Sequence, residues 1–140
     1  MQKRVIATNN APGAIGPYSQ AIGFDNLLFV SGQIPIDPES GEVVSGGIYE
    51  QTLRVLENLK GILEAGGTHM QNVLRTTIFL VDMDDYATVN EAYAQYFTND
   101  PPARATIQVS RLPKEVQVEI DAIAFVPDLA ESEPEKGTGI

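Results

Sequence analysis

The sequence predicts an α+β fold in which two helices pack on one face of a mixed β-sheet. Two stretches repeat apolar residues at helical spacing, and five short stretches are alternating or β-branched and lie between turn-forming residues. Their order is two strands, a helix, a strand, a helix and two strands. This order indicates an α+β domain, and 140 residues suit one domain.

The first two strands are expected at residues 19–24 and 27–31. Both runs are apolar, and the dipeptide Asp25-Asn26 between them is typical of a tight hairpin turn. We therefore expect them to pair antiparallel. Residues 4–8 are a candidate for one more strand.

Two helices are expected at residues 47–65 and 85–97. The first repeats its apolar residues at helical spacing and is followed by Gly66-Gly67, which would end it. The second begins at the acidic pair Asp84-Asp85 and carries an apolar and aromatic stripe. Its tyrosines Tyr86, Tyr93 and Tyr96 are interpreted as core residues. Residues 73–81, between the helices, are β-branched and aromatic and predict a strand.

The last third predicts two alternating strands at residues 103–110 and 115–126. After Pro127 the alternation stops, and the remaining residues are acidic and poor in large apolar side chains. We expect residues 1–127 to form one domain and residues 128–140 to form a flexible tail.

Composition excludes several classes of site. The chain has no cysteine and a single histidine, so neither a disulfide framework nor a multi-histidine metal site is expected. The formal net charge of −10 disfavours a nucleic-acid partner, because such a surface repels phosphate backbones. The N-terminus lacks the apolar stretch of a signal peptide, and no apolar run approaches about 20 residues. We expect a cytoplasmic protein without a membrane partner.

Polar side chains gather on the last two strands. Alternation puts Arg104 and Thr106 on one face of the first strand and Glu119 on the polar face of the second. A four-residue hairpin loop at residues 111–114 would make these faces coincide. It would pair Gln108 with Gln117, Thr106 with Glu119, and Arg104 with Asp121.

This polar sheet face, a single wall of Arg104, Thr106 and Glu119, has two interpretations. An arginine, a hydroxyl and a carboxylate can hold a small carboxylate substrate and aim a water at the neighbouring carbon. Alternatively, they form a solvated or interfacial sheet face with cross-strand ion pairs, which spacing alone favours.

Four blocks of sequence bear on this choice. They are Ala14-Ile15-Gly16-Pro17-Tyr18-Ser19-Gln20, Val30-Ser31-Gly32-Gln33-Ile34-Pro35, Pro102-Ala103-Arg104-Ala105-Thr106-Ile107, and Arg111-Leu112-Pro113-Lys114 followed by Val118-Glu119-Ile120. Together they resemble the signature of the RidA-type family of reactive-intermediate deaminases. The resemblance runs from about residue 6 to residue 125, and four blocks in order are far more specific than one short motif.

The resemblance implies roles for individual residues. Arg104 would bind the substrate carboxylate, and Glu119 would orient or activate the hydrolytic water. Tyr18 would line the pocket. Further site residues implied by the family positions are Ser31, Gly32, Asn90 and Thr106. Thr106 is a departure, because many members carry cysteine there, and a changed pocket size or reactivity is expected.

The resemblance also implies a fold and an activity. Members of the family resemble chorismate mutase in fold and form homotrimers with sites between subunits, and they use no cofactor or metal. The implied reaction is hydrolysis of 2-iminopropanoate and 2-iminobutanoate to 2-oxo acids and ammonia. The alternatives are a non-catalytic protein that binds 2-oxo acids or related metabolites and, less favoured because of the charge, an endoribonuclease or translation inhibitor.

Overall fold

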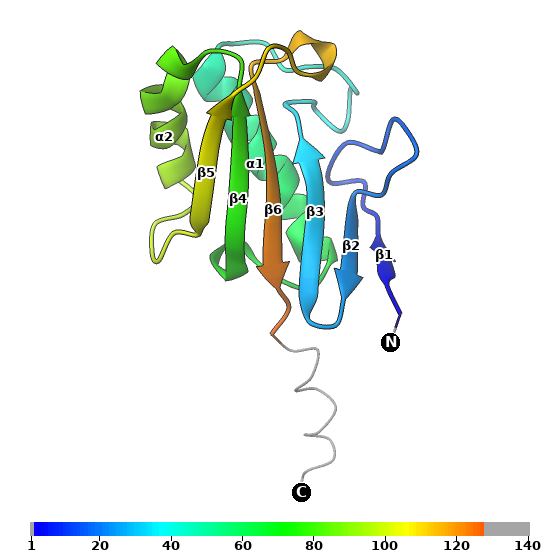
Figure 1. The fold of residues 1–140 in the computed structure, drawn as a ribbon. Coiled ribbons are helices and arrows are strands. Elements are labelled where there is room, and N and C mark those ends of the chain that lie inside the picture. Colours follow the sequence, from blue (N-terminus) through cyan, green and yellow to red (C-terminus); the bar gives the residue numbers. More distant parts are fainter. Residues whose placement is uncertain (1, 128–140) are drawn as a thin grey trace, which may run out of the picture.

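A computed structural model describes residues 2–127, and these form one six-stranded sheet with two helices (Figure 1). The strands are β1 (Arg4–Ile6), β2 (Ala21–Phe24), β3 (Leu27–Gln33), β4 (Val73–Leu80), β5 (Ala103–Gln108) and β6 (Val118–Phe125). The helices are α1 (Ile48–Ala65) and α2 (Tyr86–Ala94), with short 3-10 turns at Met70–Asn72, Met83–Asp85 and Pro113–Glu115. The predicted tail, residues 128–140, lies outside the described residues.

Helix α1 forms where the helical spacing predicts it. At its start, the Glu50 carboxylate accepts a hydrogen bond from the Gly47 N–H at 2.9 Å, which satisfies one of the free donors of the first turn. At its end, Gly67 adopts a positive φ of 88°, which favours glycine. Most of the apolar stripe of α1 is fully buried, including Val55, Leu59 and Ile62. The helix therefore supplies much of the core.

The first two predicted strands form the hairpin that the sequence indicates. Strands β2 and β3 pair antiparallel, with Phe24 opposite Leu27. Asp25 in the turn has a positive φ of 59°, a conformation that aspartate tolerates better than most residues. Strand β1 pairs antiparallel with β2, so the additional strand near the N-terminus is confirmed.

The predicted hairpin between the last two strands is wrong. The sheet order is β1-β2-β3-β6-β4-β5, so β4 lies between β5 and β6 (Figure 1). Strand β5 pairs parallel with β4, and β6 pairs antiparallel with β4. None of the predicted cross-strand pairs forms: Gln108 with Gln117, Thr106 with Glu119, and Arg104 with Asp121. The reason is that β4, α2 and β5 form a strand-helix-strand unit, which places its two strands side by side and parallel.

Both helices lie on one face of the sheet, as predicted (Figure 1). That face carries buried residues such as Ile78 on β4 and Ile120 on β6. The opposite face has no helix over it in the described chain and keeps large apolar side chains exposed: Val5 at 66%, Phe29 at 42% and Ile107 at 45%. We call it the open face of the sheet.

Helix α2 is shorter than predicted and begins at Tyr86. Tyr93 is buried as expected, but Tyr86 is 43% exposed, so its interpretation as a core residue is wrong. Within residues 2–127, neither helix has the length and apolar character needed to span a bilayer.

Candidate functional site

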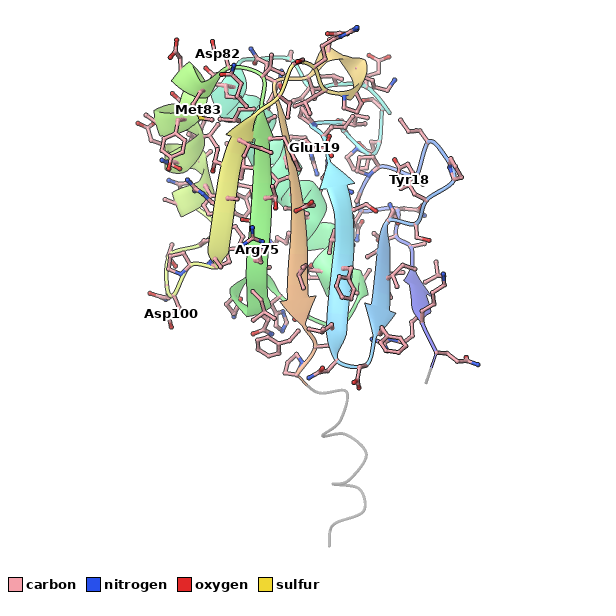
Figure 2. All side chains as sticks on the ribbon, viewed as in Figure 1. Tyr18, Arg75, Asp82, Met83, Asp100 and Glu119 are labelled. Carbon is pink, nitrogen blue, oxygen red and sulfur yellow. The ribbon has the colours of Figure 1, made fainter. Side chains whose placement is uncertain are left out.

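One pocket collects four of the residues that the sequence singles out. It has a volume of about 340 Å³ and is lined by Ile15, Tyr18, Ser31, Gly32, Ile34, Pro113 and Glu119. Figure 2 labels Glu119 on β6 and Tyr18 in the loop that precedes β2. We call it the Glu119 pocket. Its apolar residues come from two loops and the 3-10 turn at Pro113–Glu115, and its polar groups come from two neighbouring strands and one loop.

Gly32 allows the Glu119 carboxylate to lie directly against β3. A Cβ atom at position 32 would lie 2.9 Å from Cδ of Glu119 and closer still to its Oε2. The pairing of β3 with β6 is irregular between Val30 and Gln33, where Gly32 lies. A side chain at position 32 would therefore push the carboxylate away from its place in the pocket.

The environment of Glu119 favours its protonated form. Burial raises the pKa of the Glu119 carboxyl above its usual range, and the negative charge of Asp121 on the same face of β6 raises this pKa further. A carboxylate with a raised pKa is a better proton acceptor than an ordinary glutamate. Glu119 thus has the electrostatic character of a general base.

Ser31 and Tyr18 tie the loop before β2 to the pocket. The Ser31 hydroxyl donates to the carbonyl of Ser19 at 2.6 Å, and the Ser31 N–H donates to the carbonyl of Gln20 at 3.0 Å. The Tyr18 hydroxyl accepts from the Ile15 N–H at 3.3 Å, and the side chain is 50% exposed. Both residues therefore shape the wall, and Tyr18 stands at its open edge.

Arg104 lies away from this pocket, on the helix-covered face of the edge strand β5. It is opposite Thr76 in the pairing of β4 with β5, and Thr76 is fully buried. Its guanidinium Nη2 donates to the Tyr86 hydroxyl at 3.1 Å, and its Cζ lies 4.9 Å from the ring centroid of Tyr93 and 5.5 Å from that of Tyr86. We call these four residues the Arg104 cluster. A guanidinium held in this way can receive a carboxylate through its remaining donors.

Thr106 and Asn90 lie on the side of Arg104. Thr106 follows Arg104 by two residues on β5 and is opposite the buried Ile78. Asn90 follows Tyr86 by one helical turn on α2, and its Oδ1 is buried without a hydrogen-bond partner among the described residues. A buried acceptor that lacks a donor is unusual in a native structure, and a bound water or ligand would satisfy it.

The structure therefore divides the predicted site into two parts. Tyr18, Ser31, Gly32 and Glu119 come together in the Glu119 pocket, whereas Arg104, Thr106 and Asn90 lie on the other face of the sheet. The predicted single wall of Arg104, Thr106 and Glu119 is wrong.

The separation of the two parts is large. Two strand spacings of about 4.8 Å and three residues of about 3.3 Å each put the Arg104 and Glu119 Cα atoms roughly 14 Å apart. The alternation correctly grouped Arg104 with Thr106, but it could not tell which face of the sheet the helices cover.

Sequence reasoning missed the aromatic neighbours of Arg104 and the apolar lining of the Glu119 pocket. The signal for Tyr86 and Tyr93 was their spacing of seven residues, which places both on one face of a helix. Ile15, Ile34 and Pro113 lie within the motif blocks themselves, but only the fold shows that they meet.

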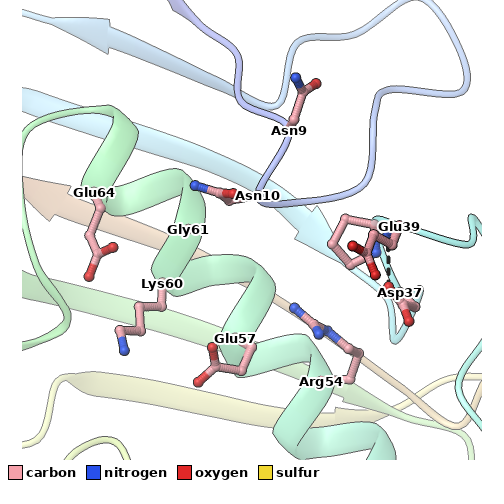
Figure 3. Close-up of a pocket in the computed structure, with 10 residues that line it drawn as sticks. Asn9, Asn10, Asp37, Glu39, Arg54, Glu57, Lys60, Gly61 and Glu64 are labelled. Atoms are coloured by element: carbon pink, nitrogen blue, oxygen red, sulfur yellow. Dashed lines mark hydrogen bonds between the residues drawn. The ribbon is translucent and has the colours of Figure 1, made fainter.

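A second pocket, of about 480 Å³, lies against the outer side of α1 (Figure 3). It contains none of the residues that the sequence predicts for the site, and its lining carries charges of both signs, including Arg54, Glu57 and Lys60. The Glu57 carboxylate already accepts a hydrogen bond from Tyr96 at 2.5 Å, and Arg54 donates to Asn58 at 3.1 Å. We assign it no role. Among residues 2–127, no three histidine, cysteine or acidic side chains are grouped as a metal site would require.

Comparison with known proteins agrees with the motifs. The sequence model of the family described as Endoribonuclease L-PSP matches residues 8–126. A RutC family protein of Pyrococcus horikoshii is 57% identical over 123 residues, which cover 88% of this chain and 98% of that protein. The human 2-iminobutanoate/2-iminopropanoate deaminase is 52% identical over 123 residues, which cover 88% of this chain and 90% of that protein.

Solved structures agree with the fold. A crystal structure of a protein of the Rid family from Yersinia pestis superposes with a TM-score of 0.86 at 48% identity, covering 89% of this chain and 100% of that one. A structure of Escherichia coli TdcF with bound serine gives a TM-score of 0.84 at 42% identity, covering 87% and 98%. Because the family match and these relatives each span most of the chain, this protein belongs to the Endoribonuclease L-PSP family and, within it, to the RidA-type proteins whose motifs it carries.

Proposed function

We propose that the protein hydrolyses short 2-imino acids, such as 2-iminopropanoate and 2-iminobutanoate, to 2-oxo acids and ammonia. The observation that carries the proposal is the Glu119 pocket, where a carboxylate with a raised pKa lies against Gly32 beside Tyr18 and Ser31. These residues stand at the family's motif positions, and relatives about 50% identical are named for this activity.

In the proposed reaction, Arg104 holds the carboxylate of the substrate and Glu119 acts on a water. As the water oxygen bonds to the imine carbon, Glu119 accepts a proton from it. Glu119 returns this proton to the substrate nitrogen, which gives a carbinolamine. Glu119 then takes the proton of the new hydroxyl and delivers it to the nitrogen as the carbon–nitrogen bond breaks, so that ammonia leaves and the carbonyl of the 2-oxo acid forms. Tyr18 covers the open edge of the pocket and limits the entry of bulk water.

A single chain cannot present Arg104 and Glu119 to the same short substrate. The two residues lie on opposite faces of the sheet, and their Cα atoms are roughly 14 Å apart by strand geometry. We therefore propose that the complete site forms between two copies of the chain, one giving Arg104 and the other giving the Glu119 pocket. The exposed apolar residues of the open face support such an assembly, because a sheet face of this kind is normally covered. A homotrimer, as the resemblance implies, is the assembly we propose.

The size of the pocket and a ligand seen in a relative support a short amino-acid-like substrate. The Escherichia coli relative was solved with serine bound, and serine carries a carboxylate and a nitrogen on the neighbouring carbon. The same two groups define a 2-imino acid. The apolar side chains of Ile15, Ile34 and Pro113 would accept a short aliphatic substituent.

Coupling the purified protein to a threonine dehydratase tests the proposal against its rivals. We expect the imine released by the dehydratase to disappear faster when the protein is present, in proportion to protein concentration. A metabolite-binding protein would bind a 2-oxo acid but leave the rate of imine decay unchanged. An endoribonuclease, as the family's description suggests, would cleave RNA, which the net charge of −10 disfavours.

A further inference from the structure

The environment of Arg104 supports an inference that rests on the proposed function. We propose that Tyr86 and Tyr93 are positioning residues that hold the guanidinium of Arg104 in the orientation needed to receive a carboxylate. They would act on the substrate only through Arg104. Three sets of contacts support this role.

The first contacts fix Tyr93 itself. Its hydroxyl shares a hydrogen bond of 2.6 Å with the Thr76 hydroxyl, and both groups are buried. Its ring packs against Phe97, with 4.5 Å between ring centroids. Thr76 stands directly opposite Arg104 in the pairing of β4 with β5, so Tyr93 reaches from Thr76 across to Arg104. The ring is therefore a fixed surface.

The second set joins that surface to Arg104. The guanidinium carbon lies 4.9 Å from the centroid of the Tyr93 ring, within the range of a cation–π contact. An arginine side chain is long and flexible, and its planar head is most useful when its orientation is set in advance. A fixed aromatic ring beside it removes much of that freedom before the substrate arrives.

The third set of contacts, between Tyr86 and Arg104, sets the direction of the guanidinium. The Tyr86 hydroxyl accepts a hydrogen bond of 3.1 Å from Nη2 of Arg104, and the Tyr86 ring centroid lies 5.5 Å from the guanidinium carbon. This bond uses one donor and leaves the others free for a bidentate carboxylate. Tyr86 is 43% exposed, so much of its side chain lies outside the core, and its ring and hydroxyl contact Arg104.

Two variants of Tyr86 test the proposal, because an exposed residue can be changed without loss of the fold. Tyr86→Phe removes only the hydrogen bond, and Tyr86→Leu also removes the ring. We expect KM for the imine to rise about threefold and about tenfold, respectively, with kcat changed by less than about twofold. Tyr96→Phe is the matched control: its hydroxyl bonds Glu57 and not Arg104, so its KM should equal that of the wild type.

Two measurements separate positioning from a general structural effect. Titration with pyruvate and with its uncharged amide should show that Tyr86→Leu weakens binding of the carboxylate alone. In spectra of ¹⁵N-labelled protein, the side-chain Nε–H signal of Arg104, assigned with Arg104→Lys, should be displaced by the nearby rings and should lose that displacement in Tyr86→Leu.

The possible outcomes are distinct. Equal pyruvate binding by the wild type and both Tyr86 variants would overturn the inference, as would an equal loss for pyruvate and the amide. If the wild type has no deaminase activity but Tyr86→Leu still weakens pyruvate binding selectively, the positioning role stands and the proposed reaction fails.

Discussion

Arg104 and Glu119 lie on opposite faces of one β-sheet, with strand β4 between the strands that carry them. Arg104 faces the helices and contacts two tyrosines, whereas Glu119 opens into a pocket on the uncovered side. A short substrate that needs both residues must therefore meet them on different copies of the chain.

Loss of the proposed carboxylate anchor should weaken turnover without unfolding the protein. We expect Arg104→Ala to lower kcat/KM by roughly two orders of magnitude, or about 3 kcal/mol, because a charge-assisted bidentate pair is lost. Arg104→Lys should recover only part of this, since an ammonium offers a point charge instead of a planar fork. Steady-state kinetics with circular dichroism as a folding control checks both. Full activity in Arg104→Ala would exclude the anchor role.

A methyl group at position 32 should displace the Glu119 carboxylate. The Cβ of Gly32→Ala would overlap the end of the Glu119 side chain, which is flexible enough to move away without disrupting the sheet. We expect at least about a tenfold loss of kcat with a nearly unchanged melting temperature. Gly13→Ala is the matched control, because nothing lies within 4 Å of a Cβ at that position. Equal activity of the two variants would show that the close approach of Glu119 to Gly32 has no catalytic role.

The pH dependence should report the raised pKa of Glu119. A general base must be ionised, so kcat/KM should fall on acidification at a higher pH than an ordinary glutamate would give. Asp121→Asn removes the charge that adds to this shift but can still accept the hydrogen bond from the Thr77 N–H. The acidic limb of the pH profile should then move to lower pH, because the like charge that raises the pKa of Glu119 is gone. If the acidic limb of the profile does not move in Asp121→Asn, a group other than Glu119 causes it.

The same shift in pKa has a consequence for stability. The pKa of Glu119 is higher in the folded protein than in the unfolded chain, so protonation of Glu119 stabilises the fold. This stabilisation is complete below the pKa of the unfolded chain and is lost as the pH rises through the pKa of the folded protein. The ionised side chain is therefore less favourable in the folded protein than the protonated one. Glu119→Gln should therefore raise the melting temperature more at pH 7 than near pH 4, while deaminase activity falls. A lower melting temperature at pH 7 would contradict this account of the pocket.

Much of the fold follows from local sequence signals. The hairpin of β2 and β3 is predicted by Asp25-Asn26 between two apolar runs, and α1 by its apolar spacing and its glycine stop. These elements depend on contacts between residues close in sequence. Tyr18 and Glu119, which only the resemblance to a family placed in one site, line the same pocket.

The pairing of the late strands could not be predicted from their own alternation. Strands β5 and β6 are neighbours in sequence with a short connection, which favours a hairpin, but β4 takes the place between them. The pattern of polar and apolar residues on β5 is also ambiguous, because an edge strand is incompletely covered on both faces: Ile107 is 45% exposed and Arg104 is half-buried. The side to which Arg104 points is therefore settled only by the packing of α2.

Mixing two inactive variants tests the central claim most directly. Arg104→Ala keeps an intact Glu119 pocket, and Glu119→Gln keeps an intact Arg104 cluster. If the site forms between chains, dissociating and reassembling an equal mixture should restore about one quarter of wild-type activity, since random assembly joins the two intact parts at one contact in four. Each variant reassembled alone should remain inactive. A mixture as inactive as its parts, with exchange of subunits verified by mass spectrometry, would contradict a site shared between chains.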